Sequence, residues 1–255
     1  MAGHFYKYHG TGNDFILVDN TKGDFRDPSA ERISKLCHRH FGIGADGLIL
    51  LESSTQADFK MVYFNADGHK GSMCGNGGRC VTHLAHNLGY VPNQGHFEGP
   101  DGLHQFRVAH PQISISMGDV FEIRTVKQGL FVDTGSPHLI CFRDNIKDLD
   151  VTTLGRKLRN EFEPGGVNVN FVCKTNDGFS MRTYERGVEA ETLSCGTGAT
   201  AAAIALMETG AVNQGSIALE TLGGILSVSC VREDSAYRNI WLTGPVMKVF
   251  KGEFQ

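Results

Sequence analysis

Two cysteines of this chain lie in closely matched segments. Residues 74–77 read Cys-Gly-Asn-Gly and residues 195–198 read Cys-Gly-Thr-Gly. An aromatic-polar segment precedes each motif, at residues 64–68 and 184–187, and a helix of small residues is predicted after each. One such motif could be a turn, but two of them indicate a duplicated fold that brings two thiols to one cleft. Two thiols facing each other across a carbon centre can remove a proton from one face and return a proton to the other.

The rest of the chain also follows one template twice. In each half a glycine-rich turn, a polar helical stretch and a strand pair lead to the cysteine, and β-rich hairpins follow the helix. The boundary is predicted near Gly118. This gives an N-terminal half at residues 1–117 carrying Cys74, a C-terminal half at residues 118–245 carrying Cys195, and a tail at residues 246–255 that could return to the first half. The predicted helices cover residues 28–40, 79–87, 151–160 and 199–208, and the principal strands cover residues 15–18, 60–64, 105–117, 130–133, 139–142, 180–184, 217–231 and 240–242.

The composition is that of an ordinary soluble globular protein. Of 255 residues, 40% are hydrophobic and 20% are charged. The formal net charge of -4 gives no reason to expect nucleic acid or an anionic membrane as a partner. The first twelve residues lack the apolar core of a signal peptide. Seven cysteines, an odd number with scattered spacing, do not indicate a disulfide framework, so a reducing cytoplasm is expected.

The position of each cysteine suits acid–base chemistry. A thiol is a poor base, but the unpaired N–H groups and the dipole at a helix N-terminus favour its thiolate form. The glycines of both motifs let the backbone approach a ligand, so the same N–H groups can hold a carboxylate. They would then stabilise the negative charge that develops when an α-proton leaves. A two-base exchange needs one cysteine as thiolate and the other as thiol.

Three other interpretations of these residues are possible. A single cysteine is most often a small buried hydrophobe, although the matched pair argues against that here. Cys74 with Cys80, or the Cys-His-Arg-His segment at residues 37–40, could supply metal ligands, but neither has the short Cys-x2-4-Cys pairing of structural zinc sites. Residues 196–201 match a loose G-x-G-x-x-A dinucleotide fingerprint. The preceding residues 189–192 are too polar for the buried strand that this fingerprint requires.

Several polar residues near the motifs are candidate partners of the thiols or of a substrate. His138 and Glu185 are predicted to hold the protonation states of the two bases apart. Arg186 could pair with a substrate carboxylate in a fork geometry, or form an ordinary salt bridge. Four asparagines lie beside glycine-rich or strand-end segments, where asparagine is also common for backbone reasons: Asn13, Asn65, Asn76 and Asn168.

Taken together, these motifs resemble those of the diaminopimelate epimerase family, in the family's order and over essentially the whole chain. The resemblance is carried by the segments at residues 9–15, 64–68, 74–80, 184–187 and 194–199. It implies an α/β (α+β) fold of two pseudo-symmetric domains, each a curved, mostly antiparallel sheet or barrel around a central helix. It further implies an isomerase that interconverts L,L- and meso-diaminopimelate without pyridoxal phosphate, metal or other cofactor. Such an enzyme is a cytoplasmic homodimer of lysine and peptidoglycan precursor biosynthesis.

The resemblance also implies residue roles. Cys74 and Cys195 would be the acid–base thiols, Cys74 taking the proton from the L,L isomer and Cys195 from the meso isomer. His138 and Glu185 would tune these thiols, and Arg186 would reach the far carboxylate of the substrate. The implied substrate-binding residues are Asn13, Asn65, Gly75, Asn76, Asn168, Glu185, Arg186, Gly196 and Thr197, of which Gly75, Asn76, Gly196 and Thr197 would hold the reacting α-carboxylate.

Two positions depart from the commonest family pattern. Gly47 stands where many members have glutamine, and Ser136 stands where many have asparagine. The alternative functions are a racemase of the same fold acting on another amino acid, such as proline or histidine, and a non-catalytic amino-acid-binding module. Proline-type enzymes tend to have histidine at the position of Asn76 and Asp-Arg-Ser at residues 185–187. A binding module would need neither two thiols nor two matched helix N-termini.

Overall fold

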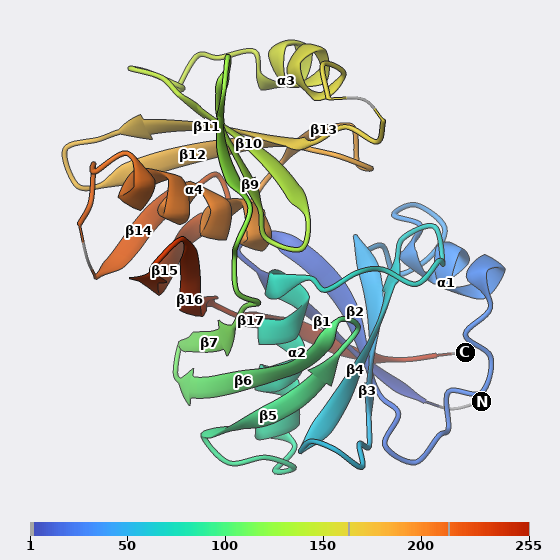
Figure 1. Cartoon of the computed structure of the whole chain (residues 1–255). Coiled ribbons are helices and arrows are strands. Elements are labelled where there is room, and N and C mark those ends of the chain that lie inside the picture. The colour runs from blue at the N-terminus through green and yellow to red at the C-terminus, as the bar shows by residue number, and fades with distance from the viewer. Residues whose placement is uncertain (1–2, 163, 214, 255) are drawn as a thin grey trace. The chain divides into compact units, whose positions relative to one another are not determined.

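The computed structural model describes residues 3–162, 164–213 and 215–254 (Figure 1). The chain forms two compact units, one of Met1–Ile115 with Gly244–Gln255 and one of Ser116–Thr243. The C-terminal strand thus belongs to the first unit, where it pairs antiparallel with the strand at the start of the chain. No helix among the described residues is both long and apolar enough to cross a membrane.

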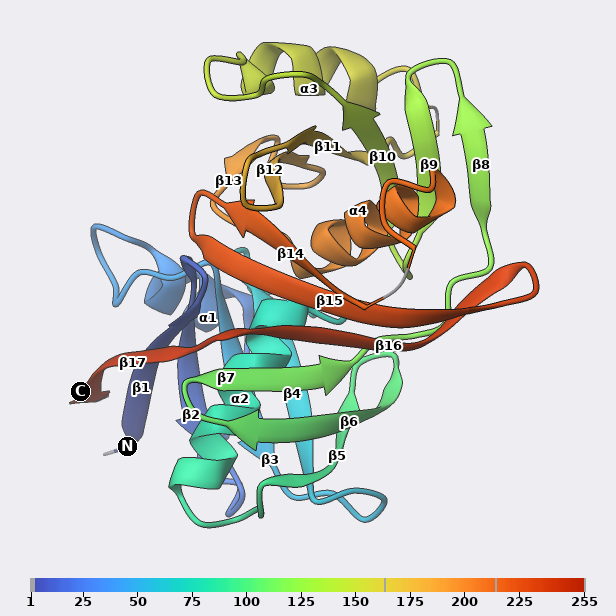
Figure 2. The same cartoon turned by 90° about the vertical axis from the view of Figure 1, so that its left-hand side faces the viewer.

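The first unit is a curved sheet with one helix on each face. Its strands are β1 (His4–Gly10), β2 (Asn13–Asp19), β3 (Gly47–Glu52), β4 (Phe59–Asn65), β5 (Gln94–Gly99), β6 (Gly102–Ala109), β7 (Gln112–Ser116) and β17 (Met247–Glu253). Helix α2 (Gly75–Asn87) packs against β1 to β4 and β6 and is enclosed by the sheet, as Figures 1 and 2 show. The shorter α1 (Ala30–Cys37) contacts β3 from the other side.

Strand β3 shows how the sequence produces this layering. Its residues Gly47 to Leu51 are all buried, because side chains that alternate along the strand meet a helix on each face. Leu48 and Leu50 join the cluster that includes Ile33 of α1. Ile49 faces the opposite way, toward Gly77 of α2. A continuous apolar run is therefore expected here rather than an alternating pattern.

The second unit repeats this arrangement. Its strands are β8 (Ile123–Val126), β9 (Gly129–Asp133), β10 (Pro137–Phe142), β11 (Asn168–Lys174), β12 (Phe179–Glu185), β13 (Ala190–Thr192), β14 (Ser216–Thr221), β15 (Gly224–Glu233) and β16 (Ala236–Pro245). Its helices are the outer α3 (Val151–Arg159) and the central α4 (Gly196–Glu208).

The strand pairings repeat between the units as well. An antiparallel pair begins each repeat, β1 with β2 and β9 with β10. A parallel neighbour follows across the outer helix, β2 with β3 and β10 with β11. A second parallel contact follows across the central helix, β4 with β5 and β12 with β14. The other strand pairs given for these repeats are antiparallel, so the predicted fold class is confirmed: two repeated units, each a mostly antiparallel curved sheet around a central helix.

The two central helices begin earlier than predicted. Helix α2 starts at Gly75 instead of Arg79, and α4 starts at Gly196 instead of Ala199. The glycines of each motif therefore form the first helical turn and are not a loop before it. The predicted C-terminal ends are confirmed, since Gly89 and Gly210 have φ angles of 78° and 71°, the left-handed conformation of a glycine that ends a helix.

Candidate active site

Cys74 is the residue that caps the N-terminus of α2. Its backbone is extended, with φ -115° and ψ 113°, and the N–H of Gly77 donates to its Sγ over 3.5 Å. The side chain is half-buried. A sulfur atom in this position accepts one of the N–H groups that the helix leaves unpaired. The same N–H groups and the helix dipole favour negative charge at the sulfur or beside it.

Two predicted substrate-binding asparagines lie at this thiol. Asn13 Oδ1 is 3.6 Å from Cys74 Sγ and accepts a hydrogen bond of 3.1 Å from Asn76 Nδ2. Asn76 is 1% exposed, so its amide is fixed by these partners. Asn65 is exposed at the end of β4, and its backbone forms the turn with Gly68 and His69.

Beneath the same helix start lies Arg79, which the sequence analysis assigned no role. Its side chain is fully buried, and its guanidinium donates to Asn76 Oδ1 over 2.9 Å and to the carbonyl of Gly75 over 3.3 Å. Among the described residues no carboxylate forms an ion pair with it. Burial lowers the pKa of Arg79 to about 10, although the nearby Cys80 and Cys74 act in the opposite direction. An arginine inside a small-residue helix was the signal that could have identified this buried cation.

Cys195 occupies the equivalent position at the start of α4. Its φ and ψ are -131° and 115°, and the N–H of Gly198 donates to its Sγ over 3.4 Å. The hydroxyl of Thr197 lies 3.4 Å from the same sulfur. Gly198 is required here, because a Cβ at this position would lie 2.5 Å from the side-chain oxygen of Asn170 and 3.3 Å from Cys195 Sγ. The second thiol is 7% exposed.

Asn170 also connects this helix start to His138. The imidazole of His138 is fully buried, and its Nδ1 lies 3.1 Å from Asn170 Nδ2. Asn170 Oδ1 in turn accepts a hydrogen bond of 2.9 Å from the hydroxyl of Thr183. Burial, followed by the charge of Arg186, lowers the pKa of His138 to about 3, so the ring is neutral at pH 7. The sequence analysis missed Asn170, whose signal was a polar residue in the apolar run of β11.

The remaining predicted residues gather at the ends of β10, β11 and β12. Asn168 donates from Nδ2 to the hydroxyl of Ser136 over 3.0 Å, and its Oδ1 accepts from the backbone N–H of Arg186 over 2.9 Å. The Arg186 side chain is exposed, with one guanidinium nitrogen 3.4 Å from the carbonyl of Gly165. Glu185 is half-buried at the end of β12 and pairs with Ala190 of β13. The shorter hydroxyl at position 136 therefore still serves as an acceptor for Asn168.

Packing accounts for the other departure from the family pattern, Gly47. A Cβ at this position would lie 2.5 Å from the carbonyl oxygen of Phe64 and 2.6 Å from the ring of Tyr63. Contacts this short do not occur between real atoms of these kinds. No side chain fits at position 47 while the Tyr63 ring occupies this space.

The structure also tests the other two kinds of site, a metal site and a dinucleotide site. In the described part of the chain, no three His, Cys, Asp or Glu side chains come together in a way that could hold a metal ion. The polar strand β13 before α4 pairs antiparallel with β12 and is only half-buried. The dinucleotide fingerprint requires a buried parallel strand at that place. The match at residues 196–201 therefore does not describe a dinucleotide site.

Comparisons with known proteins identify one family over nearly the whole chain. The family model described as diaminopimelate epimerase matches residues 5–121 and 130–249. A protein of Flavobacterium psychrophilum named diaminopimelate epimerase is 49% identical over 250 residues, covering 96% of this chain and 98% of that protein. The protein of that name from Chlorobaculum tepidum is 42% identical over 254 residues, covering 95% of this chain and 98% of its own length.

Solved structures at lower identity share the fold. A Bacillus anthracis phenazine biosynthesis protein of the PhzF family has a TM-score of 0.79 at 15% identity and covers 100% of this chain and 99% of its own. A hydroxyproline epimerase from Agrobacterium vitis has a TM-score of 0.72 at 14% identity and covers 99% of this chain and 92% of its own. These two similarities concern the fold alone, whereas the sequence matches extend over nearly the full length. The chain therefore belongs to the diaminopimelate epimerase family.

Proposed function

We propose that this protein interconverts L,L- and meso-diaminopimelate by passing protons between the α-carbon of the substrate and two thiols, Cys74 and Cys195. The observation that carries the proposal is the matched pair of cysteine N-caps. Each sulfur accepts the N–H of the third residue of its helix, from Gly77 and from Gly198. One thiolate removes the α-proton, and the other cysteine, as a thiol, donates its own proton to the opposite face of the carbon.

The helix starts would also hold the reacting carboxylate. Backbone N–H groups of Gly75 and Asn76 in one unit, and of Gly196 and Thr197 in the other, lie in the first turn of each helix. Such N–H groups are donors for an anion. Negative charge moves from the α-carbon onto the carboxylate as the proton leaves, so donors fixed in advance stabilise the transition state more than the ground state.

The other predicted residues enter the proposal as binding and supporting groups. Asn13, Asn65, Asn168 and Glu185 would contact the substrate, and the exposed guanidinium of Arg186 is suited to the far carboxylate. His138 would support the second thiol as a neutral imidazole joined to Asn170, and Glu185 would assist it. The homodimer and the cytoplasmic location stay predictions.

Proton NMR in deuterated water tests this function. The reduced protein is incubated with L,L-diaminopimelate, and with proline and histidine in parallel. We expect deuterium at the α-carbon of diaminopimelate alone, together with the meso isomer. Exchange on proline or histidine instead would retain the two-thiol mechanism and reject the substrate.

Cysteine variants distinguish an epimerase from a binding module in the same assay. Cys74→Ala and Cys195→Ala are each expected to reduce turnover by about 10³-fold, because each removes a proton-transfer group. Both variants should still bind diaminopimelate, which isothermal titration calorimetry measures. Cys230→Ala is the matched control, since this cysteine is half-buried on β15 and its Sγ lies 3.4 Å from the sulfur of Met207, in the last turn of α4 and not the first. Full turnover in either catalytic-site variant would reject the mechanism.

A further inference from the structure

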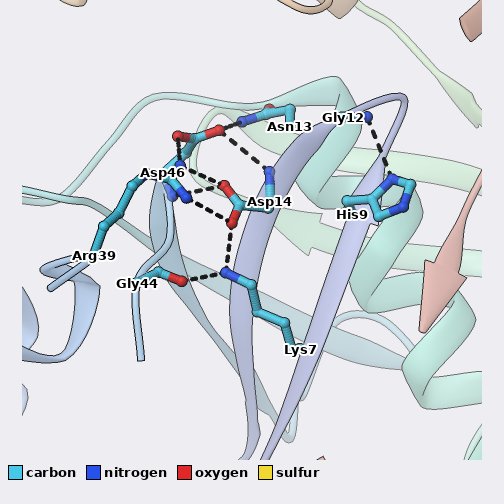
Figure 3. Close-up of polar contacts among 8 residues, drawn as sticks. All are labelled: Lys7, His9, Gly12, Asn13, Asp14, Arg39, Gly44 and Asp46. Carbon is cyan, nitrogen blue, oxygen red and sulfur yellow. Dashed lines mark hydrogen bonds and ion pairs between the residues drawn. The ribbon is translucent and has the colours of Figure 1, made fainter. Parts of the chain in front are cut away.

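A network of charged side chains lies beside Asn13, as Figure 3 shows. Its members are Lys7, Asp14, Arg39 and Asp46. Lys7 Nζ donates to Asp14 over 2.5 Å and also to the carbonyl of Gly44. Arg39 Nη2 donates to Asp14 over 2.8 Å and to Asp46 over 2.7 Å. Burial alone would raise the pKa of Asp14, but the hydrogen bonds and charges of Arg39 and Lys7 outweigh it and lower the pKa to about 2. Asp14 is therefore ionised at neutral pH.

Asp46 connects this network to Asn13. The carboxylate of Asp46 accepts a hydrogen bond of 2.7 Å from Asn13 Nδ2 and one of 3.2 Å from the backbone N–H of Asp14. Figure 3 shows the Asn13 side chain directed at this carboxylate. An ionised carboxylate can only accept hydrogen bonds. Asn13 must therefore present its NH₂ group to Asp46, and its Oδ1 is left for the opposite side, where Cys74 lies.

Arg79, on the other side of Asn76, fixes the same orientation of the Asn13 amide. A guanidinium can only donate hydrogen bonds, so Arg79 requires the oxygen of Asn76, which it meets at 2.9 Å. The NH₂ group of Asn76 then donates to Asn13 Oδ1 over 3.1 Å. The hydrogen bonds run in one sense, from Arg79 through Asn76 and Asn13 to Asp46. We call these four residues the amide relay.

The amide relay determines what Cys74 meets at its sulfur. Asn13 Oδ1 is 3.6 Å from Sγ and can accept a hydrogen bond but cannot donate one. A thiol can donate its S–H to this oxygen, whereas a thiolate would face a partial negative charge. Hydrogen bonding to the protonated form of a group favours that form.

We propose that Asp46 is a positioning residue that keeps Cys74 protonated in the resting protein, by holding the Asn13 carbonyl oxygen against the thiol. For turnover this rests on the proposed function, in which Cys74 is one of the two acid–base groups. In the direction from the meso isomer, where Cys195 removes the α-proton, Cys74 then begins as the acid of the pair and donates its proton to the α-carbon. The Asn13 oxygen afterwards faces a thiolate, which favours return of a proton to the sulfur.

Other charges around Cys74 act on it as well. The buried Arg79 favours the thiolate, as does the N–H of Gly77. Lys7, Asp14 and Arg39 form the outer part of the network, which is joined to Asn13 through Asp46. A variant at Asp46 leaves Arg79, Gly77, Lys7 and Asp14 in place, so it isolates the orientation of Asn13.

The test is the pH dependence of alkylation at Cys74 in the full-length reduced protein. Iodoacetamide labels each cysteine, and peptide mass spectrometry gives the rate at Cys74 and at Cys195 separately. In Asp46→Ala the Asn13 amide loses the carboxylate that holds its NH₂ group and keeps only the hydrogen bond from Asn76, so its oxygen is no longer held against the thiol. We expect the Cys74 midpoint to fall by about one pH unit, which is about tenfold faster labelling below the midpoint. The Cys195 profile should not move.

Asp46→Asn is the matched control, because it keeps an oxygen acceptor for Asn13 and removes the charge. Its Cys74 profile should stay near that of the unaltered protein. An unchanged Cys74 midpoint in Asp46→Ala would overturn the proposal. So would an equal shift in Asp46→Asn, which would indicate a charge effect, or a parallel shift at Cys195. If Asp46→Ala does not fold, Arg39→Ala loosens the carboxylate and should shift Cys74 in the same direction by a smaller amount.

This readout is separate from the proposed function. A Cys74 shift in a protein that exchanges no deuterium into diaminopimelate would support the relay and reject the substrate. Exchange of deuterium without any Cys74 shift in Asp46→Ala would leave the epimerase intact and reject the role of Asp46.

Discussion

The two cysteine sites share a backbone and differ in the groups that surround it. Cys74 and Cys195 both cap a central helix with extended backbone and accept the N–H of the third helical residue. Five positions beyond each cysteine, the first unit has the buried cation Arg79 and the second has the buried neutral Thr200. The first site is supported by the ionised amide relay, the second by the neutral His138 held by Asn170.

This difference has a chemical reason. Two identical sites would give two thiols with the same preference for a proton, and neither would be set as base while the other is acid. A repeated fold places the two sulfurs at equivalent helix starts, and we propose that their unequal neighbours give them unequal protonation. Variants that change one residue at a time in each unit test this difference.

The largest effect is expected from the pair Arg79 and Thr200. Arg79→Met removes the donor that fixes Asn76 and should lower turnover about 10²-fold, the cost of losing one fixed donor near developing charge. Thr200→Val removes only a hydroxyl that donates to the carbonyl of Gly196 within the same helix. It should lower turnover less than about tenfold. Deuterium exchange measures both variants, with circular dichroism to confirm folding. Equal losses in the two would contradict the proposed asymmetry.

A difference in stability, and not in turnover, is expected between the two glycines that donate to the thiols. Gly198→Ala places a Cβ 2.5 Å from the Asn170 side chain, which is held by other partners, and should lower the free energy of unfolding by about 3 kcal/mol. Gly77→Ala meets only the flexible ends of Ile49 and Met61, at 2.8 and 3.1 Å. Its cost should be about 1 kcal/mol. Urea denaturation gives both values. A Gly77 variant as unstable as the Gly198 variant would show that the first site is packed as tightly as the second.

The smallest effect concerns acid stability. The pKa of His138 falls from 6.5 in the unfolded chain to about 3 in the folded protein, through burial and then Arg186. Below pH 6.5 the unfolded chain therefore binds a proton that the folded protein does not, and stability is lost as pH falls toward 3. We expect a loss of about 2 kcal/mol by pH 5.

A variant tests the source of this pH dependence. His138→Gln should flatten the curve of unfolding free energy against pH between 6.5 and 4, measured by urea denaturation. In the first unit, burial followed by His110 lowers the pKa of His83 to about 4. His83→Gln should flatten the curve of unfolding free energy against pH less than His138→Gln, because the pKa of His83 is lowered less than that of His138. A steeper curve in His138→Gln would contradict the buried neutral ring.

Much of the fold could be predicted from the sequence because its signals are local. The apolar run of α4 indicated a helix buried on all sides, and its residues from Ala199 to Leu206 are buried. The glycines at positions 89 and 210 marked the helix ends. The helix starts were placed a few residues late, because a cysteine is not a usual N-cap residue and glycine is a poor helix former. Both penalties are offset here by the hydrogen bond to sulfur and by packing.

The candidate site was predicted only in part. The motifs identified Cys74, Asn76 and Cys195, which lie at the helix starts as expected. Asn170 and Asp46 were missed, because each acts through a neighbour that is distant in sequence. Arg79 was missed although it lies three residues from Asn76, because only the folded chain shows that its charge is buried there. Asp46, for example, holds an amide that lies 33 residues away in the chain.

The sequence by itself determined the duplication, the two cysteine-capped helices and the family, since these depend on short motifs and on periodic apolar residues. Only the tertiary structure decided how the two sites differ. Hydrogen-bond direction depends on which obligate donor or acceptor stands at each end of a network, and chain folding brings those groups together. In the folded chain, Arg79 and Asp46 define that direction around Cys74. In the sequence, neither residue forms a recognisable motif with Asn13.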